Sequence, residues 1–376
     1  MSGIYIHIPF CRKACIYCDF HFSTQLEYKE KMVQAICKEI ELQKDYAGGE
    51  AVESIYFGGG TPSVLSNEEL NAILNSVTKD HIVSEKVEIT LEANPDDLTE
   101  ERIKEFKQAG INRLSIGIQS FDEEELKWMN RSHTVDQSVA CVKAAQNKGF
   151  DNITIDLIYG SKFQDINKWK NNLQKAFDLN VQHISAYNLT IESKTVLGNW
   201  FGKGIEPAVN DEFSQQCFEW LMEETERKGF IQYEISNFGT NHHFAVHNSN
   251  YWKGNKYIGI GPSAHSYDGK NRQWNIANNP QYIKSIESGI VPFEKEELSI
   301  NDQYNEYLLT RLRTMWGVDL NYIEKQFGEK YLNSFLENTK EYISNGEMVK
   351  NNSVYTLTKK GKLLADRISS ELFEEN

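Results

Sequence analysis

Residues 11–18 read CRKACIYC and directly follow a short apolar run at residues 4–10. Three thiolates on a loop this tight, Cys11, Cys15 and Cys18, can hold three corners of a four-iron cluster and leave the fourth iron open. A structural zinc site is the alternative, but zinc usually takes four protein ligands, and no second cysteine pair follows to complete such a site. The spacing therefore favours an iron–sulfur cluster.

The composition is that of an ordinary globular protein. Its 376 residues, 40% of them hydrophobic, can bury a sizeable core, and the length suggests one large domain and a smaller one. The apolar runs are far shorter than the roughly 20 residues that cross a bilayer, and no signal peptide is recognisable. The remaining cysteines, Cys37, Cys141 and Cys217, are scattered and form no disulfide framework. We therefore expect a cytoplasmic protein.

Strand-like and helix-like segments alternate through the first half of the chain. After the run at 4–10, strand-like runs rich in β-branched and aromatic residues cover 52–57, 87–91, 113–118, 153–158 and 183–189. Helix-like segments cover 26–44, 67–78, 99–108, 122–129, 135–147 and 166–177. Six strand–helix units predict a parallel sheet with helical crossovers. Because eight such units close a full barrel, we expect an α/β fold with a partial, TIM-like (β/α)6 barrel.

Polar residues occur at the carboxyl ends of these strands, where ligands bind in such folds. The run GGGTP at 58–62 lets backbone amides approach a ligand, although a plain turn explains it equally well. Glu92, Gln119 and Asp156 lie in or at the ends of three further strands. Any one of them alone is explained as a satisfied core group, but several at successive strand ends indicate ligand contacts.

The stretch at 242–252 is rich in histidine. It contains His242, His243 and His247 and ends in an aromatic pair. Histidine is the commonest metal ligand and aromatic rings stack on flat ligands, so the stretch could ligate a metal or hold a planar aromatic molecule. An ordered surface loop with solvated histidines explains the same residues, and the residue types leave these alternatives open.

The pattern changes at residue 301. Helix-like segments at 304–315, 320–327 and 331–344 precede a hairpin, 348–349 with 354–357, and a last helix after Thr358. This order predicts a winged-helix-like domain, a type that often binds DNA. The chain carries 54 acidic and 40 basic residues, a formal charge of −14, and therefore lacks the basic surface that nucleic acid requires. We expect the domain to cap the barrel or meet a partner.

The spacing C-x3-C-x2-C, with Tyr17 before the last cysteine, resembles the signature of the radical S-adenosylmethionine (SAM) family. The resemblance implies a [4Fe–4S] cluster held by Cys11, Cys15 and Cys18, whose open iron binds SAM. Radical chemistry then belongs to the cofactor, while the protein positions and shields it. The run GGGTP resembles the family's segment that receives the SAM amine. Coproporphyrinogen-oxidase-like members of the family imply the following cofactor contacts: Tyr5, Tyr17, Gly59, Gly60, Thr61, Glu92, Gln119, Arg131 and Asp156.

Residues 247–252, HNSNYW, match the H-N-x-x-Y-W pattern of the heme chaperone branch of this family, and GIGPSAHS at 259–266 also resembles that branch. The resemblance implies heme as a ligand, with His247 as the candidate contact and His265 as its competitor. It implies an unidentified heme-acceptor protein as a partner. It leaves open a homodimer and a transient membrane association through the acceptor.

The alternative is an enzyme of the same family, oxygen-independent coproporphyrinogen III dehydrogenase, which carries out a radical oxidative decarboxylation. Those enzymes resemble C-x3-C-x2-C-x-C, and here Phe20 stands at the last position. They also carry a long arm before the cysteine loop, whereas ten residues precede Cys11. Together with the HNxxYW pattern, these departures favour a heme chaperone that carries a cluster with exchangeable SAM.

We expect the chain to have three parts. Residues 1–235 form the radical SAM partial barrel with the cluster. Residues 236–300 form a connecting segment with the HNxxYW motif and the candidate heme site. Residues 301–376 form the winged-helix-like domain, of the family's C-terminal type. No residue is assigned a catalytic role.

Overall fold

A computed structural model describes residues 2–46 and 48–375. In this part of the chain the larger sheet has twelve strands in the order β12-β11-β10-β9-β1-β2-β3-β4-β5-β6-β8-β7. Six strands at its centre run parallel to one another. They are β1 (Ser2–Ile8), β2 (Val52–Gly59), β3 (Val83–Ala93), β4 (Arg113–Gln119), β5 (Ile153–Tyr159) and β6 (His183–Asn188). The predicted partial (β/α)6 barrel is confirmed.

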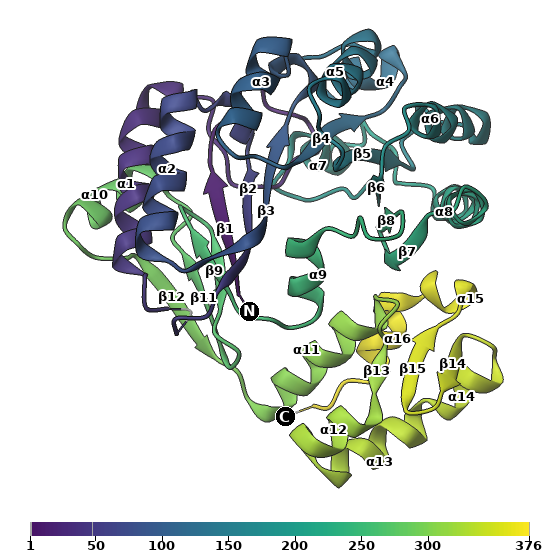
Figure 1. Cartoon of the computed structure of the whole chain (residues 1–376). Coiled ribbons are helices and arrows are strands. Elements are labelled where there is room, and N and C mark those ends of the chain that lie inside the picture. The colour runs from purple at the N-terminus through teal and green to yellow at the C-terminus, as the bar shows by residue number, and fades with distance from the viewer. Residues whose placement is uncertain (1, 47, 376) are drawn as a thin grey trace.

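Helices cover the outer side of the curved sheet (Figure 1). They are α1 (Lys29–Leu42), α2 (Asn67–Asp80), α3 (Glu100–Gln108), α4 (Glu123–Trp128), α5 (Val135–Asn147), α6 (Ile166–Asp178) and α8 (Asp211–Arg227). The short helix α7 (Val196–Gly202) instead packs on the cysteine loop, where the Leu197 amide donates to the Ile16 carbonyl at 2.9 Å. Short 3-10 turns precede α1, α2 and α3 at η1 (Leu26–Tyr28), η2 (Pro62–Val64) and η3 (Pro95–Asp97). Helix α2 begins with a capping box, in which Ser66 and Glu69 satisfy each other's backbone amides.

Successive residues along each central strand face opposite sides of the sheet. Ile4, Ile6 and Ile8 of β1 pack with Met32 and Ile36 of α1 in one continuous apolar core. Burying this face under the helices is the main favourable term in the stability of the barrel. The residues between them point the other way, into the barrel.

Further strands extend the sheet at both edges. Beyond β6 lie β8 (Asn237–Gly239) and β7 (Ile231–Glu234). Beyond β1 lie β9 (Tyr257–Ile260), β10 (His265–Tyr267), β11 (Asn271–Asn275) and β12 (Phe293–Glu297), and β9 runs parallel to β1. Two helices accompany them, α9 (Val246–Trp252) and α10 (Asn279–Glu287). Residues 236–300, expected as a connecting segment, thus continue the large sheet.

The C-terminal part has its own sheet, in the order β13-β15-β14, and its own apolar core. Its elements are α11 (Ile300–Leu312), β13 (Val318–Asp319), α12 (Leu320–Phe327), α13 (Glu329–Asn338), α14 (Lys340–Ser344), β14 (Met348–Asn351), β15 (Val354–Leu357), α15 (Lys359–Lys362) and α16 (Ala365–Glu371). Helices around a small hairpin match the predicted winged-helix-like order. The single helix predicted over 331–344 is instead two helices that meet at Thr339.

The C-terminal domain is attached to the barrel through the loop that follows α11. The backbone amide of Ile235 donates to the Arg313 carbonyl at 3.0 Å, and the Met315 amide donates to the Tyr233 carbonyl at 3.0 Å. The Arg313 guanidinium also pairs with the buried Glu234 carboxylate at 3.1 Å. In Figure 1, α9 lies between the barrel and this domain. Among the described residues no helix has the length and apolar character to span a bilayer.

Candidate functional site

The inner face of the barrel is polar, in contrast to its apolar outer face. Tyr5 of β1, Tyr56 of β2 and Glu92 of β3 contact one another there, because the Tyr5 and Tyr56 rings stack at 6.2 Å and the Tyr56 hydroxyl donates to Glu92 Oε1 at 2.7 Å. Across the barrel, the Ser115 hydroxyl of β4 donates to the Asp156 carboxylate of β5 at 3.3 Å. A polar interior of this kind suits a polar ligand, since buried polar groups need hydrogen-bond partners.

The cysteine loop leaves β1 at its carboxyl end, which we call the cysteine end of the barrel. Its neck is closed by backbone hydrogen bonds from Cys11 to Ser23 at 3.0 Å and from Ser23 to Pro9 at 2.9 Å. The Thr61 amide donates to the Phe10 carbonyl at 2.8 Å, and the Thr61 hydroxyl donates to Cys11 Sγ at 3.3 Å. The GGGTP segment after β2 therefore packs directly on the neck of the loop.

The turn after α4 holds the other side of the loop. The Asn130 side chain donates to the Ala14 carbonyl at 2.6 Å, and the Ile16 amide donates to the Met129 carbonyl at 3.3 Å. Asn130 adopts a positive φ of 59°, a conformation that asparagine tolerates better than most residues. The loop is thus fixed on both sides before any cofactor binds.

Arg131 connects the cysteine loop to the ends of β3 and β4. Its guanidinium donates to Cys15 Sγ at 3.3 Å, to Asn94 Oδ1 at 2.6 Å and to the Gly117 carbonyl at 2.7 Å. Its Nε is buried without a hydrogen-bond partner. Arg131 is therefore not a solvated surface charge, and its unpaired donor can serve an anionic group bound at this end.

The three loop thiols are free, with Cys11 buried and Cys15 and Cys18 half-buried. Burial raises the pKa of Cys11 and of Cys18 to about 11 in each case. Within residues 2–46 and 48–375, no three His, Cys, Asp or Glu side chains converge on a single metal ion. That geometry does not test a four-iron cluster, in which cysteines bind different iron atoms. Tyr17, beside these thiols, packs on a small apolar cluster that includes Ile16.

The glycine run lets the backbone of β2 approach the barrel lining closely. A Cβ on Gly59, whose φ is 104°, would lie 2.6 Å from the His7 ring, and a Cβ on Gly60 would lie 2.6 Å from the Phe10 carbonyl oxygen. Neither position tolerates a side chain. The GGGTP run therefore lies against the His7 ring and the Phe10 backbone of the protein itself, and Gly60 is part of the support of the cysteine loop. Its contact with a ligand stays a prediction.

The Glu92 and Asp156 carboxylates face the barrel interior, and neither forms an ion pair with any described residue. Burial raises the pKa of Glu92 to about 7, although the hydrogen bond from Tyr56 opposes the shift and the nearby Asp156 adds to it. Burial raises the pKa of Asp156 to about 6, against hydrogen bonds from Ser185 and Ser115. Both side chains are only partly covered, so they can accept hydrogen bonds from amine or hydroxyl groups of a ligand.

Gln119 ends β4 in a strained backbone conformation. Its φ is 67°, in the left-handed region that a residue other than glycine rarely adopts. A Cβ on Gly117 would come within 2.8 Å of the Gln119 amide nitrogen and 3.3 Å of an Arg131 terminal nitrogen. Backbone strain of this kind concentrates at functional sites. Glu92 and Gln119 thus lie at the ends of the neighbouring strands β3 and β4, and Arg131 reaches the same region from the turn after α4.

His247 lies elsewhere, near the amino-terminal ends of the strands, which we call the domain end of the barrel. Its Nδ1 is 3.0 Å from the Ser54 hydroxyl, its ring stacks on Tyr56 at 5.1 Å, and its amide donates to Glu88 at 3.1 Å. Burial lowers its pKa to about 4, so the imidazole is neutral at pH 7. Figure 1 shows its helix, α9, on the side opposite the arrowhead of β1.

The competitor, His265, has a different setting. It is exposed at the start of β10, and its ring stacks on Trp274 at 6.0 Å. Burial of part of its ring lowers the pKa of His265. Of the other histidines in the motif region, His242 is exposed and His243 is half-buried. The histidine-rich stretch thus brings no group of imidazoles together at one point.

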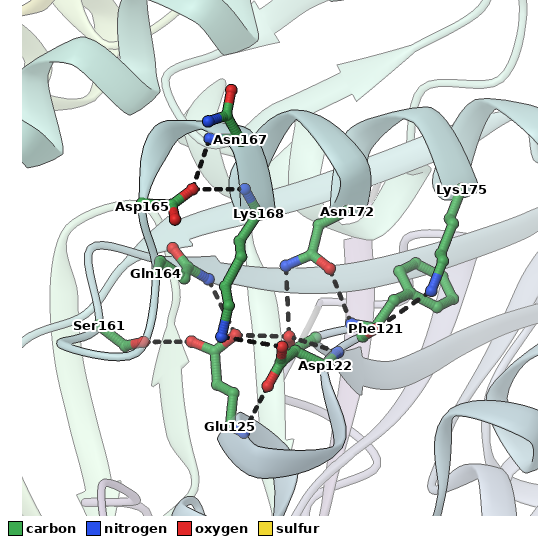
Figure 2. Close-up of polar contacts among 11 residues, drawn as sticks. Phe121, Asp122, Glu125, Ser161, Gln164, Asp165, Asn167, Lys168, Asn172 and Lys175 are labelled. Carbon is green, nitrogen blue, oxygen red and sulfur yellow. Dashed lines mark hydrogen bonds and ion pairs between the residues drawn. The ribbon is translucent and has the colours of Figure 1, made fainter.

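Sequence reasoning missed a buried carboxylate that anchors α4, shown in Figure 2. Glu125 accepts hydrogen bonds from the hydroxyls of Ser120 and Ser161 and, at 3.1 Å, from the Gln164 amide. These partners follow β4 and β5, so Glu125 joins α4 to two strand ends. The sequence alone gives little indication that Glu125 is buried, because it stands beside two solvated acids, Glu123 and Glu124.

Other missed residues line the barrel. The Tyr5 hydroxyl is 3.0 Å from His7 Nδ1, and His7 Nε2 is 2.8 Å from the His21 carbonyl. Asn94, which bonds to Arg131, follows Glu92 by two residues on the same strand end. The alternation of β1 and β3 could have indicated His7 and Asn94, since both share a face with predicted residues.

The donor set at the cysteine end fits the cofactors that the cysteine pattern implies. Three thiols on a supported loop suit three irons of a cluster. SAM carries a carboxylate, an amine and hydroxyls. The unpaired Arg131 Nε suits the carboxylate, and the two partly accessible carboxylates suit the amine and hydroxyls. The glycine segment, which has no room for side chains, suits a ligand lying along its backbone.

The chain is similar to known proteins over nearly its whole length. The radical SAM superfamily model matches residues 5–176, and the HemN C-terminal domain model matches residues 298–364. The heme chaperone HemW of Bacillus subtilis is 34% identical over 98% of both chains. The chain belongs to the HemW family. The HemW protein of Lactococcus lactis is 32% identical, over 98% of this chain and 96% of its own.

The HemW family assignment is consistent with the fold of a solved relative. The coproporphyrinogen III oxidase HemN from Escherichia coli superposes with a TM-score of 0.86, over 99% of this chain and 90% of its own, at 21% identity. That likeness concerns the fold. As a radical SAM protein, a HemW family member is implied to carry a [4Fe–4S] cluster and SAM.

Proposed function

We propose that this protein is a heme chaperone, which binds heme and passes it to an acceptor protein while carrying a [4Fe–4S] cluster with exchangeable SAM. The observation that carries the proposal is the similarity to curated heme chaperones over 98% of the chain. The HNSNYW motif at 247–252, set at the domain end of the barrel, supports it.

Cys11, Cys15 and Cys18 would hold the cluster, and Tyr17 would pack beside it. Gly59, Gly60 and Thr61 would lie along SAM. Tyr5, Glu92, Gln119, Arg131 and Asp156 would complete the contacts. When bound, the cluster can supply an electron to SAM.

The protein's own groups have definable tasks at this site. Arg131 keeps its charge at any physiological pH, fixes the loop through Cys15 and offers Nε to a ligand carboxylate. Glu92 and Asp156 accept hydrogen bonds from ligand amine or hydroxyl groups. We expect slow SAM cleavage, or cleavage under special conditions only, because a carrier needs no turnover.

At the heme site, His247 is the proposed contact and His265 the competitor. His247 is neutral and fixed in orientation by Ser54, which suits an imidazole that binds iron. The acceptor protein is unidentified. A homodimer and a transient membrane contact through the acceptor belong to the same proposal, as does a division of the chain near residue 300.

The alternative function is that of a coproporphyrinogen III dehydrogenase. It is considered because this chain shares the fold of HemN. A shared fold does not establish a shared reaction. Phe20 stands where those enzymes carry a further cysteine, and its side chain is 69% exposed beside the cysteine loop. The chaperone is therefore the function we favour.

One experiment separates the two functions. Reconstituted protein is incubated without oxygen with SAM, a strong reductant and coproporphyrinogen III, and decarboxylated porphyrin is measured. A heme titration of the same preparation accompanies it. We expect no product and stoichiometric heme binding. Decarboxylated product would make the protein an enzyme of heme synthesis, and absence of heme binding would refute the chaperone.

A further inference from the structure

A slot lined by aromatic side chains lies between the extended edge of the large sheet and the C-terminal domain. The end of α9, the strands β9 to β11 and the helices α11 and α12 all contribute to its walls. Its lining includes the following side chains: Tyr251, Lys253, Tyr257, Tyr267, Arg272, Glu306, Tyr307, Arg311, Tyr322 and Phe327. Its position at the domain end separates it from the cysteine loop.

The slot has two facing aromatic walls. On the sheet side, Tyr257 lies 5.7 Å from Tyr251 and 6.4 Å from Tyr267, measured between ring centroids. On the other side, Tyr322 stacks on Tyr307 at 4.4 Å and approaches Phe327. Aromatic rings on two sides of one cavity suit a planar aromatic ligand, because such a ligand can stack on them.

The charges of the slot differ from those of the whole chain. Three basic residues line the slot, Lys253, Arg272 and Arg311. Among the described residues of its lining, Glu306 is the one acidic residue. Arg272 of β11 pairs with Glu306 of α11 at 2.9 Å, while Arg311 donates to the Lys253 carbonyl at 3.1 Å. On a protein with a formal charge of −14, this local excess of cations favours a ligand with carboxylates.

We propose that this slot binds one edge of the heme macrocycle, with its carboxylates toward Arg272 and Arg311. The inference rests on the proposed heme chaperone function and assigns that function a site. The cavity measures about 160 Å³, whereas pockets that enclose a whole drug-sized ligand measure about 300–1,000 Å³. The slot therefore holds an edge, and the rest of the macrocycle stays accessible for transfer.

The slot adjoins the candidate heme contact. Tyr251 follows His247 by four residues on α9, so the two residues lie about one turn apart on the same helix. Tyr251 is 42% exposed in the slot, while His247 points under the barrel toward Ser54. In this proposal the slot binds the edge of the macrocycle. His247, which lies outside the slot, is the candidate contact for the iron.

Titration with hemin and with iron-free protoporphyrin IX tests the slot in the full-length chain. Arg272→Gln removes the cation proposed to pair with a carboxylate of the porphyrin. We therefore expect about tenfold weaker binding of both porphyrins. Tyr322→Ala removes one stacking ring and should weaken both about fivefold. Tyr322→Phe keeps the ring and should bind as the unaltered protein does.

Matched controls lie outside the slot. Arg367→Gln breaks an exposed ion pair with Glu371, and Tyr28→Ala removes an exposed ring. Both should leave porphyrin affinity unchanged. If the unaltered protein binds hemin and the slot variants bind it equally well, the slot proposal is overturned and the chaperone function stands. If the unaltered protein binds no hemin, the chaperone function fails, and the slot proposal fails with it.

Discussion

The two ends of the barrel are built differently. At the cysteine end, side-chain and backbone hydrogen bonds tie the loop to the GGGTP segment and to the turn after α4, with Arg131 between them. At the domain end, aromatic rings around α9 and α11 leave a cavity that two domains share. In our proposals the cysteine end holds a cofactor rigidly, whereas the domain end binds a flat ligand by its surface. The following predictions test this difference.

The largest effect is expected at the cysteine loop. Replacement of Cys15 by Ala should abolish the broad visible absorption of anaerobically reconstituted protein and remove most of its bound iron. Cys37→Ala, on α1 and away from the loop, should leave both unchanged. Retention of four irons by the Cys15 variant would contradict the assignment of the cluster.

Glu125→Leu should destabilise the cysteine end by about 2–4 kcal/mol, because Ser120, Ser161 and Gln164 would lose a buried partner. Glu125→Gln keeps part of the hydrogen bonding and should cost less. Urea unfolding of the cluster-free protein measures both. Equal stability of the two variants would mean that the network shown in Figure 2 does not anchor α4.

At the domain end, His247→Ala should shift the Soret band of bound hemin or weaken its binding, while iron content and cluster absorption stay the same. His265→Ala is the comparison, since its exposed ring contacts Trp274. An unchanged spectrum in the His247 variant, with a shifted one in the His265 variant, would exchange their roles. Loss of the cluster in either variant would show that the two ends are not independent.

The smallest effect concerns pH. Glu92 keeps its proton to a higher pH in the folded chain, about 7, than its ordinary value of 4.5, so the folded state binds more protons between these values. Its contribution to the free energy of unfolding therefore falls as pH rises through this window. Between pH 5 and pH 8, the free energy of unfolding of the Glu92→Gln variant should fall by about 1–2 kcal/mol less than that of the unaltered protein. Urea midpoints at both pH values check this, and identical pH dependence would contradict it.

The cysteine end could be predicted in large part from the sequence. Its residues follow strands whose apolar alternation is clear, and parallel strands bring their carboxyl ends to one edge. Gly59, Glu92 and Gln119 were placed at strand ends in this way, whereas Arg131 came from the family resemblance alone. Glu125 was not, because burial of one acid among several on a short helix depends on tertiary packing.

The domain end could not be predicted to the same extent. The strands β11 and β12 read NRQWN and FEKEE, with little apolar alternation, and every residue of β12 is exposed. Because these strands could not be recognised in the sequence, the pairing of residues 257–260 with β1 could not be predicted either. The position of His247 beneath Tyr56 and the slot beside Tyr251 both follow from that pairing.

The pairing of β9 with β1 also decides where the chain can be cut. A fragment that ends at residue 235 would leave β1 with an open edge, since its neighbour on that side, β9, would be gone. Unpaired edge strands invite association with other chains. A fragment that ends at residue 300 keeps every strand of the large sheet. Of the two, the longer fragment is the one suited to expression of the barrel alone.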